Sequence, residues 1–334
     1  MALFLVFLCF FSSVNASPPT KPQPVSFEAL VFVNADMQYI SAHGASSAAP
    51  VLLVLHGGPG LAYSGFCRKY QTELEESFIV VNWDQRGCGK SWQIGFDPEE
   101  LSVGLLLEDV HALTIILKEK YKKEKIFLLG HSWGTRLGLL AAQKYPEDYL
   151  AFFGAGQVTG EQGENEALYD KVLETARERA DEESVKILLE NGKGAANQDW
   201  FTAYLRKKLA QYGFVDRDFN IVKAVVSSFS GMPDDVKARS EQYWESGAQV
   251  YKNLSKEIQT MESFFTLIPE IKIPVIFLEG RYDYIASSEL AAKYLDKLKA
   301  PYKKIVWFEN SAHWMLFQES KKFNQAVIEE AKKF

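Results

Sequence analysis

Short apolar runs rich in β-branched side chains recur along this chain, and longer amphipathic stretches separate them. Such uninterrupted runs are typical of strands that are buried on both faces of a sheet. The runs lie at residues 51–55, 78–82, 125–129, 150–154, 274–278 and 304–308, preceded by β-rich segments at 27–33 and 37–41. Helical periodicity appears at residues 101–121, 134–145, 287–298 and 320–333. Because strand and helix alternate, the pattern predicts an α/β fold, a mostly parallel sheet flanked by helices.

The alternation stops in the middle of the chain. From about residue 157 to residue 265 there is no clear buried strand, and helical patterns occupy residues 167–180, 200–211 and 233–251. Strand and helix alternate again from residue 271. We therefore expect residues 25–156 and 266–334 to form one core and residues 157–265 to form an inserted α-helical cap.

The chain begins with an apolar run over residues 1–11, which small and polar residues follow up to Ala16. This pattern predicts a signal peptide over residues 1–16, although no Lys or Arg precedes the run. The run is too short to span a hydrocarbon core of ~30 Å, so we expect no stable membrane anchor. The sequence therefore predicts a secreted or otherwise exported protein (extracellular, periplasmic or lumenal). The alternative is a buried N-terminal helix or strand.

Composition narrows the class of protein. The 334 residues are 47% hydrophobic, which is enough for a large core, and the formal net charge is −6. A nucleic-acid-binding face needs clustered Lys and Arg, so we expect no nucleic-acid partner. Removal of residues 1–16 would leave Cys67 and Cys88, which could pair in an oxidising compartment or remain as two buried thiols. Asn253 begins a glycosylation sequon, which has meaning only in a eukaryotic host.

Residues 130–134 read Gly-His-Ser-Trp-Gly and match the pattern G-x-S-x-G. They lie between a predicted strand and a predicted helix, which is the context that a nucleophile elbow requires. The turn is so sharp that its flanking positions must be small, which explains glycine at 130 and 134. The pattern predicts that Ser132 is a catalytic nucleophile.

A serine nucleophile needs a base and a group that orients the base. In this kind of site the partners follow the serine in the order acid, then histidine. Asp283 follows the predicted strand 274–278, and His313 follows the strand 304–308. His313 is the only histidine after Ser132, whereas Asp283 could also be a surface turn carboxylate. We predict a triad of Ser132, Asp283 and His313.

Residues 56–60 read His-Gly-Gly-Pro-Gly and follow the predicted strand 51–55. The backbone N–H of Trp133, the residue after the nucleophile, is expected to be one oxyanion donor, and this loop is where a second donor must come from. Glycines allow the backbone to approach a substrate carbonyl closely, so Gly57 is a candidate for substrate contact. We interpret His56 as a residue that orders the loop.

Together these motifs resemble the prolyl iminopeptidase (prolyl aminopeptidase) family of α/β-hydrolases. That family combines His-Gly-Gly-Pro-Gly, Asp-Gln-Arg-Gly-Cys-Gly-x-Ser and Gly-x-Ser-Trp-Gly, which here occupy residues 56–60, 84–91 and 130–134. The resemblance extends to residues 280–283 and to Ala312-His313, on both sides of the insertion. It implies an α/β-hydrolase fold, the same triad, and oxyanion N–H groups from Gly58 and Trp133.

The resemblance does not extend into the cap. In that family acidic residues in or near the cap bind the free amino terminus of the substrate, but the usual cap motifs do not align here. Residues 160–200 hold eleven Asp or Glu against five Lys or Arg. Three glutamates stand close together near the start of the cap and are candidates for amine binding, although each could instead belong to a solvated helix face. These residues are Glu161, Glu164 and Glu166.

The motifs thus predict a serine hydrolase, and the resemblance implies that it releases an N-terminal residue, proline preferred, from short peptides. The first alternative is an esterase or lactonase that uses the same triad on a small ester, because a fold does not determine a substrate. A more remote alternative is a non-catalytic binding protein on a hydrolase scaffold. We expect no metal and no organic cofactor, since the sequence contains no cysteine–histidine cluster. The sequence does not indicate an oligomeric state.

Overall fold

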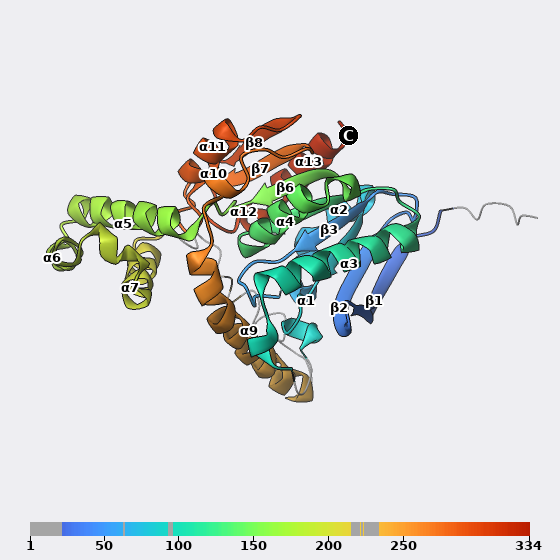
Figure 1. Cartoon of the computed structure of the whole chain (residues 1–334), viewed down its shortest axis with the longest axis horizontal. Helices are drawn as coiled ribbons and strands as arrows, with labels where there is room; N and C mark the ends of the chain where they lie inside the picture. The colour runs from blue at the N-terminus through green and yellow to red at the C-terminus, as the bar shows by residue number, and fades with distance from the viewer. Residues whose placement is uncertain (1–21, 63, 93–95, 215–220, 222, 224–233) are drawn as a thin grey trace, which may run out of the picture.

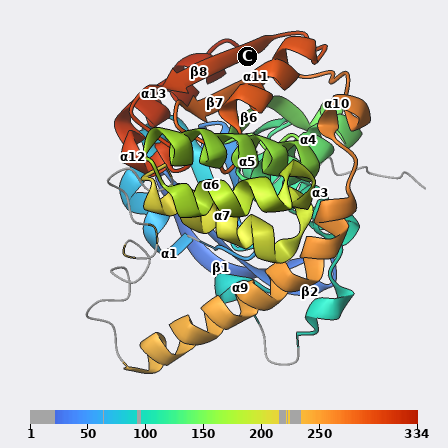
Figure 2. The same cartoon turned by 90° about the vertical axis from the view of Figure 1, so that its left-hand side faces the viewer.

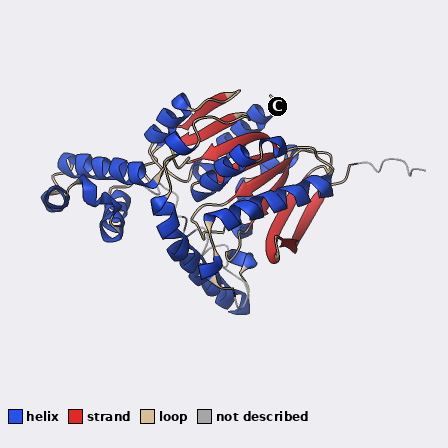
Figure 3. Ribbon diagram, in the orientation of Figure 1, coloured by secondary structure: helices blue, strands red, loops and turns tan. Residues whose placement is uncertain are grey.

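A computed structural model describes residues 22–62, 64–92, 96–214, 221, 223 and 234–334. In this part of the chain a twisted sheet lies between two layers of helices, and a group of helices projects to the left of the sheet (Figures 1 and 3). The predicted signal peptide at residues 1–16 lies outside the described residues. None of the described helices is both long enough and apolar enough to cross a membrane.

The described strands form one eight-stranded sheet in the order β1-β2-β4-β3-β5-β6-β7-β8. The pairs β1–β2 and β2–β4 are antiparallel, and the other pairs are parallel. The strands are β1 (Val25–Val33), β2 (Asp36–Gly44), β3 (Val51–Leu55), β4 (Ile79–Trp83), β5 (Ile126–His131), β6 (Tyr149–Ala155), β7 (Val275–Gly280) and β8 (Lys303–Phe308). The prediction of a mostly parallel sheet is confirmed. The carboxyl ends of β3, β5, β6, β7 and β8 consequently lie at the same edge.

Helices cover both faces of this sheet. Val51, Leu53 and Leu55 of β3 face one layer of helices, and Leu52 and Val54 face the other, because successive side chains in a strand point to opposite faces. This burial on both faces explains the uninterrupted apolar run in the sequence. The first layer holds α3 (Val103–Tyr121), α4 (Trp133–Lys144) and α11 (Ser288–Lys297), and the second holds α1 (Ser64–Cys67), α2 (Thr72–Ser77), α12 (Met315–Gln318) and α13 (Ser320–Ala331).

The described part of the segment between β6 and β7 is mainly helical. Its α-helices are α5 (Glu161–Glu178), α6 (Glu182–Asn191), α7 (Asp199–Gln211), α9 (Asp234–Thr260) and α10 (Phe264–Leu267). Figure 2 shows α5, α6 and α7 stacked as one group, with α9 running diagonally beside them. The group α5–α7 has its own apolar cluster, which includes Leu168, Phe201 and Leu205. Short 3₁₀ helices are η1 (Arg68–Tyr70), η2 (Gly89–Ser91), η3 (Pro98–Glu100), η4 (Pro146–Asp148) and η5 (Lys193–Asn197).

Two details of the sequence pattern differ from the structure. The helix expected at 167–180 begins earlier, since α5 covers Glu161–Glu178, and α6 was not expected at all. The side chain of Asp181 accepts a hydrogen bond from the Ser184 backbone N–H and caps α6. Cys67 and Cys88 are both buried and free, so the structure has two unpaired thiols rather than a disulfide.

Candidate active site

Ser132 occupies the sharp turn between β5 and α4. Its backbone has φ 54° and ψ −121°, a left-handed conformation that is strained for a residue with a side chain. A Cβ at Gly134 would lie 2.1 Å from the Leu55 carbonyl oxygen, and one at Gly130 would lie 2.4 Å from the Gly134 carbonyl oxygen. Both positions must therefore be glycine for strand and helix to approach this closely. The fold holds the turn in place because the Ser132 N–H donates to the Ala155 carbonyl at 2.9 Å.

Asp283 and His313 meet at the carboxyl ends of β7 and β8. The His313 ring Nδ1 lies 2.8 Å from the Asp283 Oδ2, and both residues are buried. The other carboxylate oxygen of Asp283 accepts the backbone N–H groups of Ile285 and Ala286, each at 3.0 Å. One carboxylate oxygen therefore faces the imidazole and the other is held by the loop that follows Asp283.

His131, the residue before Ser132 in the chain, is hydrogen-bonded to His313. His131 Nε2 donates to the His313 carbonyl at 2.8 Å, and the two imidazole rings lie 4.9 Å apart. Burial holds the pKa of His131 well below its usual value, so its ring is neutral. Within the described residues, the hydrogen bond of the His313 ring goes to Asp283 and not to the Ser132 hydroxyl. Catalytic hydrogen bonds commonly tighten only when substrate is bound.

The loop 56–60 lies against the elbow. A Cβ at Gly57 would lie 3.1 Å from the Ser132 Cβ, so a larger residue here would press against the Ser132 side chain. Gly58 has φ 118°, a conformation that favours glycine. His56 orders the loop: its Nδ1 donates to the Gly57 carbonyl at 2.8 Å, and its Nε2 accepts the Gln85 N–H at 3.1 Å. Burial lowers the pKa of His56 to about 4, and its ring is therefore neutral, as these two bonds require.

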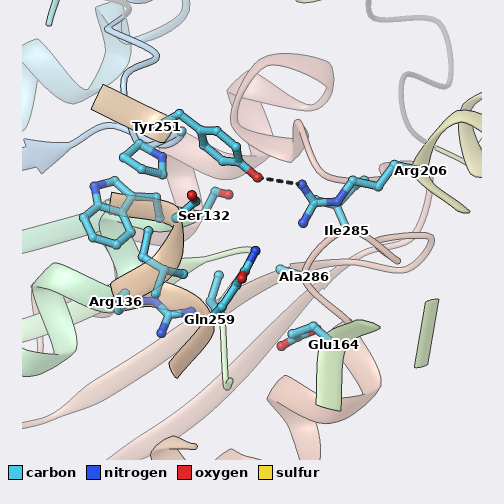
Figure 4. Close-up of a pocket in the computed structure, with 14 residues that line it drawn as sticks. Ser132, Arg136, Glu164, Arg206, Tyr251, Gln259, Ile285 and Ala286 are labelled. Carbon is cyan, nitrogen blue, oxygen red and sulfur yellow. Dashed lines mark hydrogen bonds between the residues drawn. The ribbon is translucent and has the colours of Figure 1, made fainter. Parts of the chain in front are cut away.

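A pocket of about 100 Å³ opens over Ser132 (Figure 4). Its wall combines the elbow, the loop 56–60, the cap and the loop after Asp283. Figure 4 shows Tyr251 and Arg206 on one side of the pocket, joined by a hydrogen bond of 3.4 Å, and Glu164 on another. The lining residues are Gly58, Pro59, Ser132, Trp133, Arg136, Val158, Glu164, Arg206, Tyr251, Ser255, Ile258, Gln259, Ile285 and Ala286.

The three glutamates proposed for amine binding separate in the structure. Glu164 is buried and lines the pocket with Ser132. Glu166 lines a different hollow between α5 and α11, where it accepts a hydrogen bond from Gln162 at 3.1 Å. The side chain of Glu161 lies outside the described part of the chain. Among the candidates whose side chains are described, only Glu164 thus lines the same pocket as Ser132.

Two buried glutamates, Glu164 and Glu279, interact electrostatically with Asp283. Burial raises the pKa of Glu164 to about 8, and the nearby Asp283 contributes in the same direction. Glu279 at the end of β7 is also buried, and burial together with Asp283 raises its pKa well above the usual value. One oxygen of Glu279 accepts the Gln157 N–H at 3.0 Å. These two glutamates therefore have a stronger tendency to be protonated than ordinary carboxyls.

Sequence reasoning did not identify several residues of this site. Gln85 donates to the His56 carbonyl at 3.0 Å and accepts the indole N–H of Trp133 at 3.0 Å, so it joins the loop 56–60 to the elbow. Two signals were available: its place in the motif at residues 84–91, and its position just after β4, at the edge of the sheet that carries Ser132. Arg136, Arg206 and Tyr251 come from helix faces whose orientation only packing decides. In the described residues, no group of His, Cys, Asp and Glu is arranged to hold a metal ion.

The fold and this site define a hydrolase of the α/β type, and comparisons with known proteins agree. Residues 50–320 match the α/β-hydrolase fold family, and this chain belongs to that family. It is 31% identical over 300 residues to the probable aminopeptidase YbaC of Bacillus subtilis, covering 88% of this chain and 93% of that protein. It is 24% identical over 295 residues to a proline iminopeptidase of Saccharolobus solfataricus, covering 83% of each chain.

A solved structure shows the same fold at lower identity. The proline iminopeptidase-related protein TTHA1809 from Thermus thermophilus superposes with a TM-score of 0.61 at 20% identity, covering 91% of this chain and 96% of that one. The chain is therefore an α/β-hydrolase with aminopeptidase-like relatives, as the sequence motifs predicted.

Proposed function

We propose that this protein is a serine aminopeptidase of the prolyl iminopeptidase type, with Ser132, His313 and Asp283 as its catalytic triad. The observation that carries the proposal is the contact of 2.8 Å between His313 and Asp283 at the edge of the sheet where the strained Ser132 elbow lines a pocket. A nucleophile, a base and an orienting carboxylate are the three parts that acyl transfer needs.

In the proposed reaction, the Ser132 Oγ attacks the carbonyl carbon of the first peptide bond while His313 Nε2 takes its proton. Asp283 holds the Nδ1–H tautomer of the imidazole, and the loop after it keeps the carboxylate in place. The tetrahedral intermediate then expels the amine, which receives the proton from His313. Water releases the first residue from Ser132 by the same steps in reverse order.

The N–H groups of Gly58 and Trp133 are proposed to stabilise the oxyanion. Trp133 is the first residue of α4, and Gly58 lines the same pocket. Backbone donors that are already in place need no reorganisation during the reaction, and one such donor is typically worth about 3–4 kcal/mol in the transition state. Gly57 supports this arrangement because a larger residue would contact the Ser132 side chain.

Three features support a short substrate with a free amino terminus. The pocket is small and the cap residues Arg206, Tyr251 and Gln259 form part of its wall. Glu164 accepts three hydrogen bonds within the protein, and a carboxylate has about four lone-pair sites, so one site remains for an ammonium group. Two relatives are named as an aminopeptidase and a proline iminopeptidase. The preference for proline rests on the relative's name.

One observation favours the second candidate, an esterase or lactonase. The pocket wall includes two arginines, Arg136 and Arg206, and the pKa of Glu164 is raised to about 8, which weakens its negative charge near neutral pH. Such a wall is less suited to a cationic amine than a wall of ionised carboxylates would be.

The test is to offer the purified protein prolyl and other aminoacyl anilides together with a panel of short aryl esters. We expect anilide hydrolysis that requires a free α-amino group and that falls by a factor of at least ~10⁴ in Ser132→Ala. N-acetylated anilides are the matched control. Ester cleavage without any anilide turnover would replace the aminopeptidase by an esterase, and full activity in Ser132→Ala would exclude a serine mechanism altogether.

We also propose that residues 1–16 direct export and are removed before Ser17, since their pattern is that of a signal peptide. When the full chain is expressed, the protein should then be recovered outside the cytoplasm with Ser17 as its first residue, as determined by N-terminal sequencing. Recovery of the chain with Met1 intact inside the cell would contradict export.

A further inference from the structure

Glu164 is a cap residue that reaches into the core. It lies in the first turn of α5, and its Oε1 accepts the Thr159 N–H at 3.0 Å and the Thr159 hydroxyl at 2.8 Å. Its Oε2 accepts the backbone N–H of Ser287. Ser287 caps α11 in the catalytic core, 123 residues further along the chain. A single carboxylate therefore joins the beginning of the cap to the loop that follows Asp283.

This loop, residues 283–288, is wrapped around the Asp283 carboxylate. Ile285 and Ala286 donate their N–H groups to the Asp283 Oδ1, and the Ser288 N–H donates to the Asp283 carbonyl at 3.1 Å. The Ser287 N–H, between these donors, is the one that Glu164 holds. The contacts of Glu164 and Asp283 thus restrain successive peptide groups of the same short loop.

We propose that Glu164 is a positioning residue, which fixes the loop 283–288 and through it the Asp283 carboxylate that orients His313. The inference rests on the proposed triad and adds to it a residue from the cap. It differs from amine binding, because the three hydrogen bonds described are made within the protein and act whether or not the substrate carries an amine.

The burial of Glu164 is consistent with this role. A carboxyl taken out of water loses solvation, and this loss raises its pKa to about 8. Its hydrogen bonds replace part of that solvation, and the Ser287 N–H lies at the N-terminus of α11, where the helix dipole favours negative charge. A reacting group that is out of place lowers the reaction rate even when the mutation is remote from the chemistry. A shift of the Ser287 backbone is therefore expected to move the Asp283 carboxylate and with it the His313 ring.

The decisive substrate is one without an amine. In Glu164→Gln, the new amide N–H₂ replaces one of the two oxygens that now accept hydrogen bonds from Thr159 and Ser287. An N–H₂ group cannot accept from an N–H donor, so part of the connection between cap and core is lost. We expect kcat on para-nitrophenyl acetate to fall about 10- to 100-fold with little change in KM. The kcat on prolyl para-nitroanilide should fall by the same factor. Glu174→Gln, the same substitution at an exposed site on the same helix, is the matched control and should keep wild-type kcat.

A double-variant cycle separates positioning from a general structural role. If Glu164 acts through Asp283, Glu164→Gln should cost much less in an Asp283→Asn background than in the wild type. Should Glu164→Gln not fold, as judged by circular dichroism, Glu164→Asp is measured instead, because it keeps a carboxyl group on a shorter side chain.

A readout without turnover completes the test. The Nδ1 proton between His313 and Asp283 is expected to give a low-field proton NMR signal that is absent from Asp283→Asn. This signal should shift or broaden in Glu164→Gln and remain unchanged in Glu174→Gln.

The outcomes are distinct. Unchanged ester turnover in Glu164→Gln with a raised KM for the anilide would make Glu164 an amine anchor only and would overturn the inference. If Glu164→Gln lowers kcat in the Asp283→Asn background by as much as in the wild type, the inference is overturned as well. If the wild type cleaves neither substrate, the proposed function fails, and the NMR signal alone decides: a change in Glu164→Gln supports positioning, and no change overturns it.

Discussion

At the scale of single residues, the candidate site depends on polar side chains that hold the loop 56–60 against the Ser132 elbow. Gln85 is the clearest case, since its amide joins the His56 carbonyl to the Trp133 indole and its N–H binds the His56 ring. The neutral His56 then holds the Gly57 carbonyl. The proposed oxyanion donors, Gly58 and Trp133, are thereby positioned from both sides by one glutamine.

Gln85→Leu is expected to lower kcat by about 10- to 100-fold and to leave KM for a short ester largely unchanged, because the oxyanion donors are used mainly in the transition state. Removing the amide also leaves buried polar groups without their partner, at a cost of about 1–3 kcal/mol in unfolding free energy. Steady-state kinetics and urea unfolding measure the two effects. Gln325→Leu on the exposed side of α13 should change neither, and an unaffected kcat in Gln85→Leu would contradict the assignment.

At the scale of elements, the insertion consists of two parts. The helices α5, α6 and α7 share an apolar cluster of their own, whereas Val250, Leu254 and Ile258 of α9 belong to the cluster of the main core. The α5–α7 group therefore has a core that can be disturbed separately. Phe201 is fully buried in that cluster, and the adjacent Trp200 is 55% exposed.

Phe201→Ala is expected to lower the unfolding free energy of the α5–α7 group by about 3–5 kcal/mol, because it leaves a cavity in a small core. Amide hydrogen exchange should accelerate in α5, α6 and α7 while β5 keeps its protection. Trp200→Ala, one position away, should change exchange far less. Equal acceleration in β5 would show that cap and sheet unfold as one unit.

At the scale of the whole molecule, buried carboxyls make stability depend on pH. Burial raises the pKa of Glu164, Glu279 and Asp84. A carboxyl with a raised pKa in the folded state keeps its proton at a pH where the unfolded chain has lost it. The folded protein then binds more protons than the unfolded chain, and its stability falls as pH rises.

For Glu164 this window runs from about pH 4.5 to about pH 8. The lowered pKa values of buried His56 and His131 act in the opposite sense below about pH 6.5. The unfolding free energy should therefore decline between about pH 6.5 and about pH 8, with a limiting slope of about 1.4 kcal/mol per pH unit for each carboxyl that titrates. Urea unfolding at several pH values measures the slope. Glu279→Gln removes one such group and should flatten the decline, and Glu174→Gln should not. A flat wild-type profile between about pH 6.5 and about pH 8 would contradict the raised pKa values.

Much of the site could be predicted from sequence because its determinants are local. The Gly-His-Ser-Trp-Gly turn requires small residues where strand and helix approach, and the positive φ of Ser132 follows from that turn. Asp283 and His313 each follow a strand of the parallel part of the sheet, and parallel strands end at one edge. The order of the motifs along the chain was therefore sufficient to bring the two residues together.

Contacts between distant segments required the tertiary structure. The bond from Trp133 to Gln85 spans 48 residues, and that from Ser287 to Glu164 spans 123. Helical periodicity in the insertion identifies an apolar face, but it does not say which polar residues of the opposite face will line the pocket of Ser132. That is why Glu161, Glu164 and Glu166 had equal standing in the sequence.

The sequence by itself determined the α/β architecture, the strained serine elbow and the strand ends that carry Asp283 and His313. The reason is that β-branched runs, glycine positions and strand order act over a few residues. Only the tertiary structure decided that Glu164 lines the pocket of Ser132 while Glu166 lies in another hollow. Packing of the cap on the core decides those positions, and that packing depends on many weak contacts that no short motif encodes.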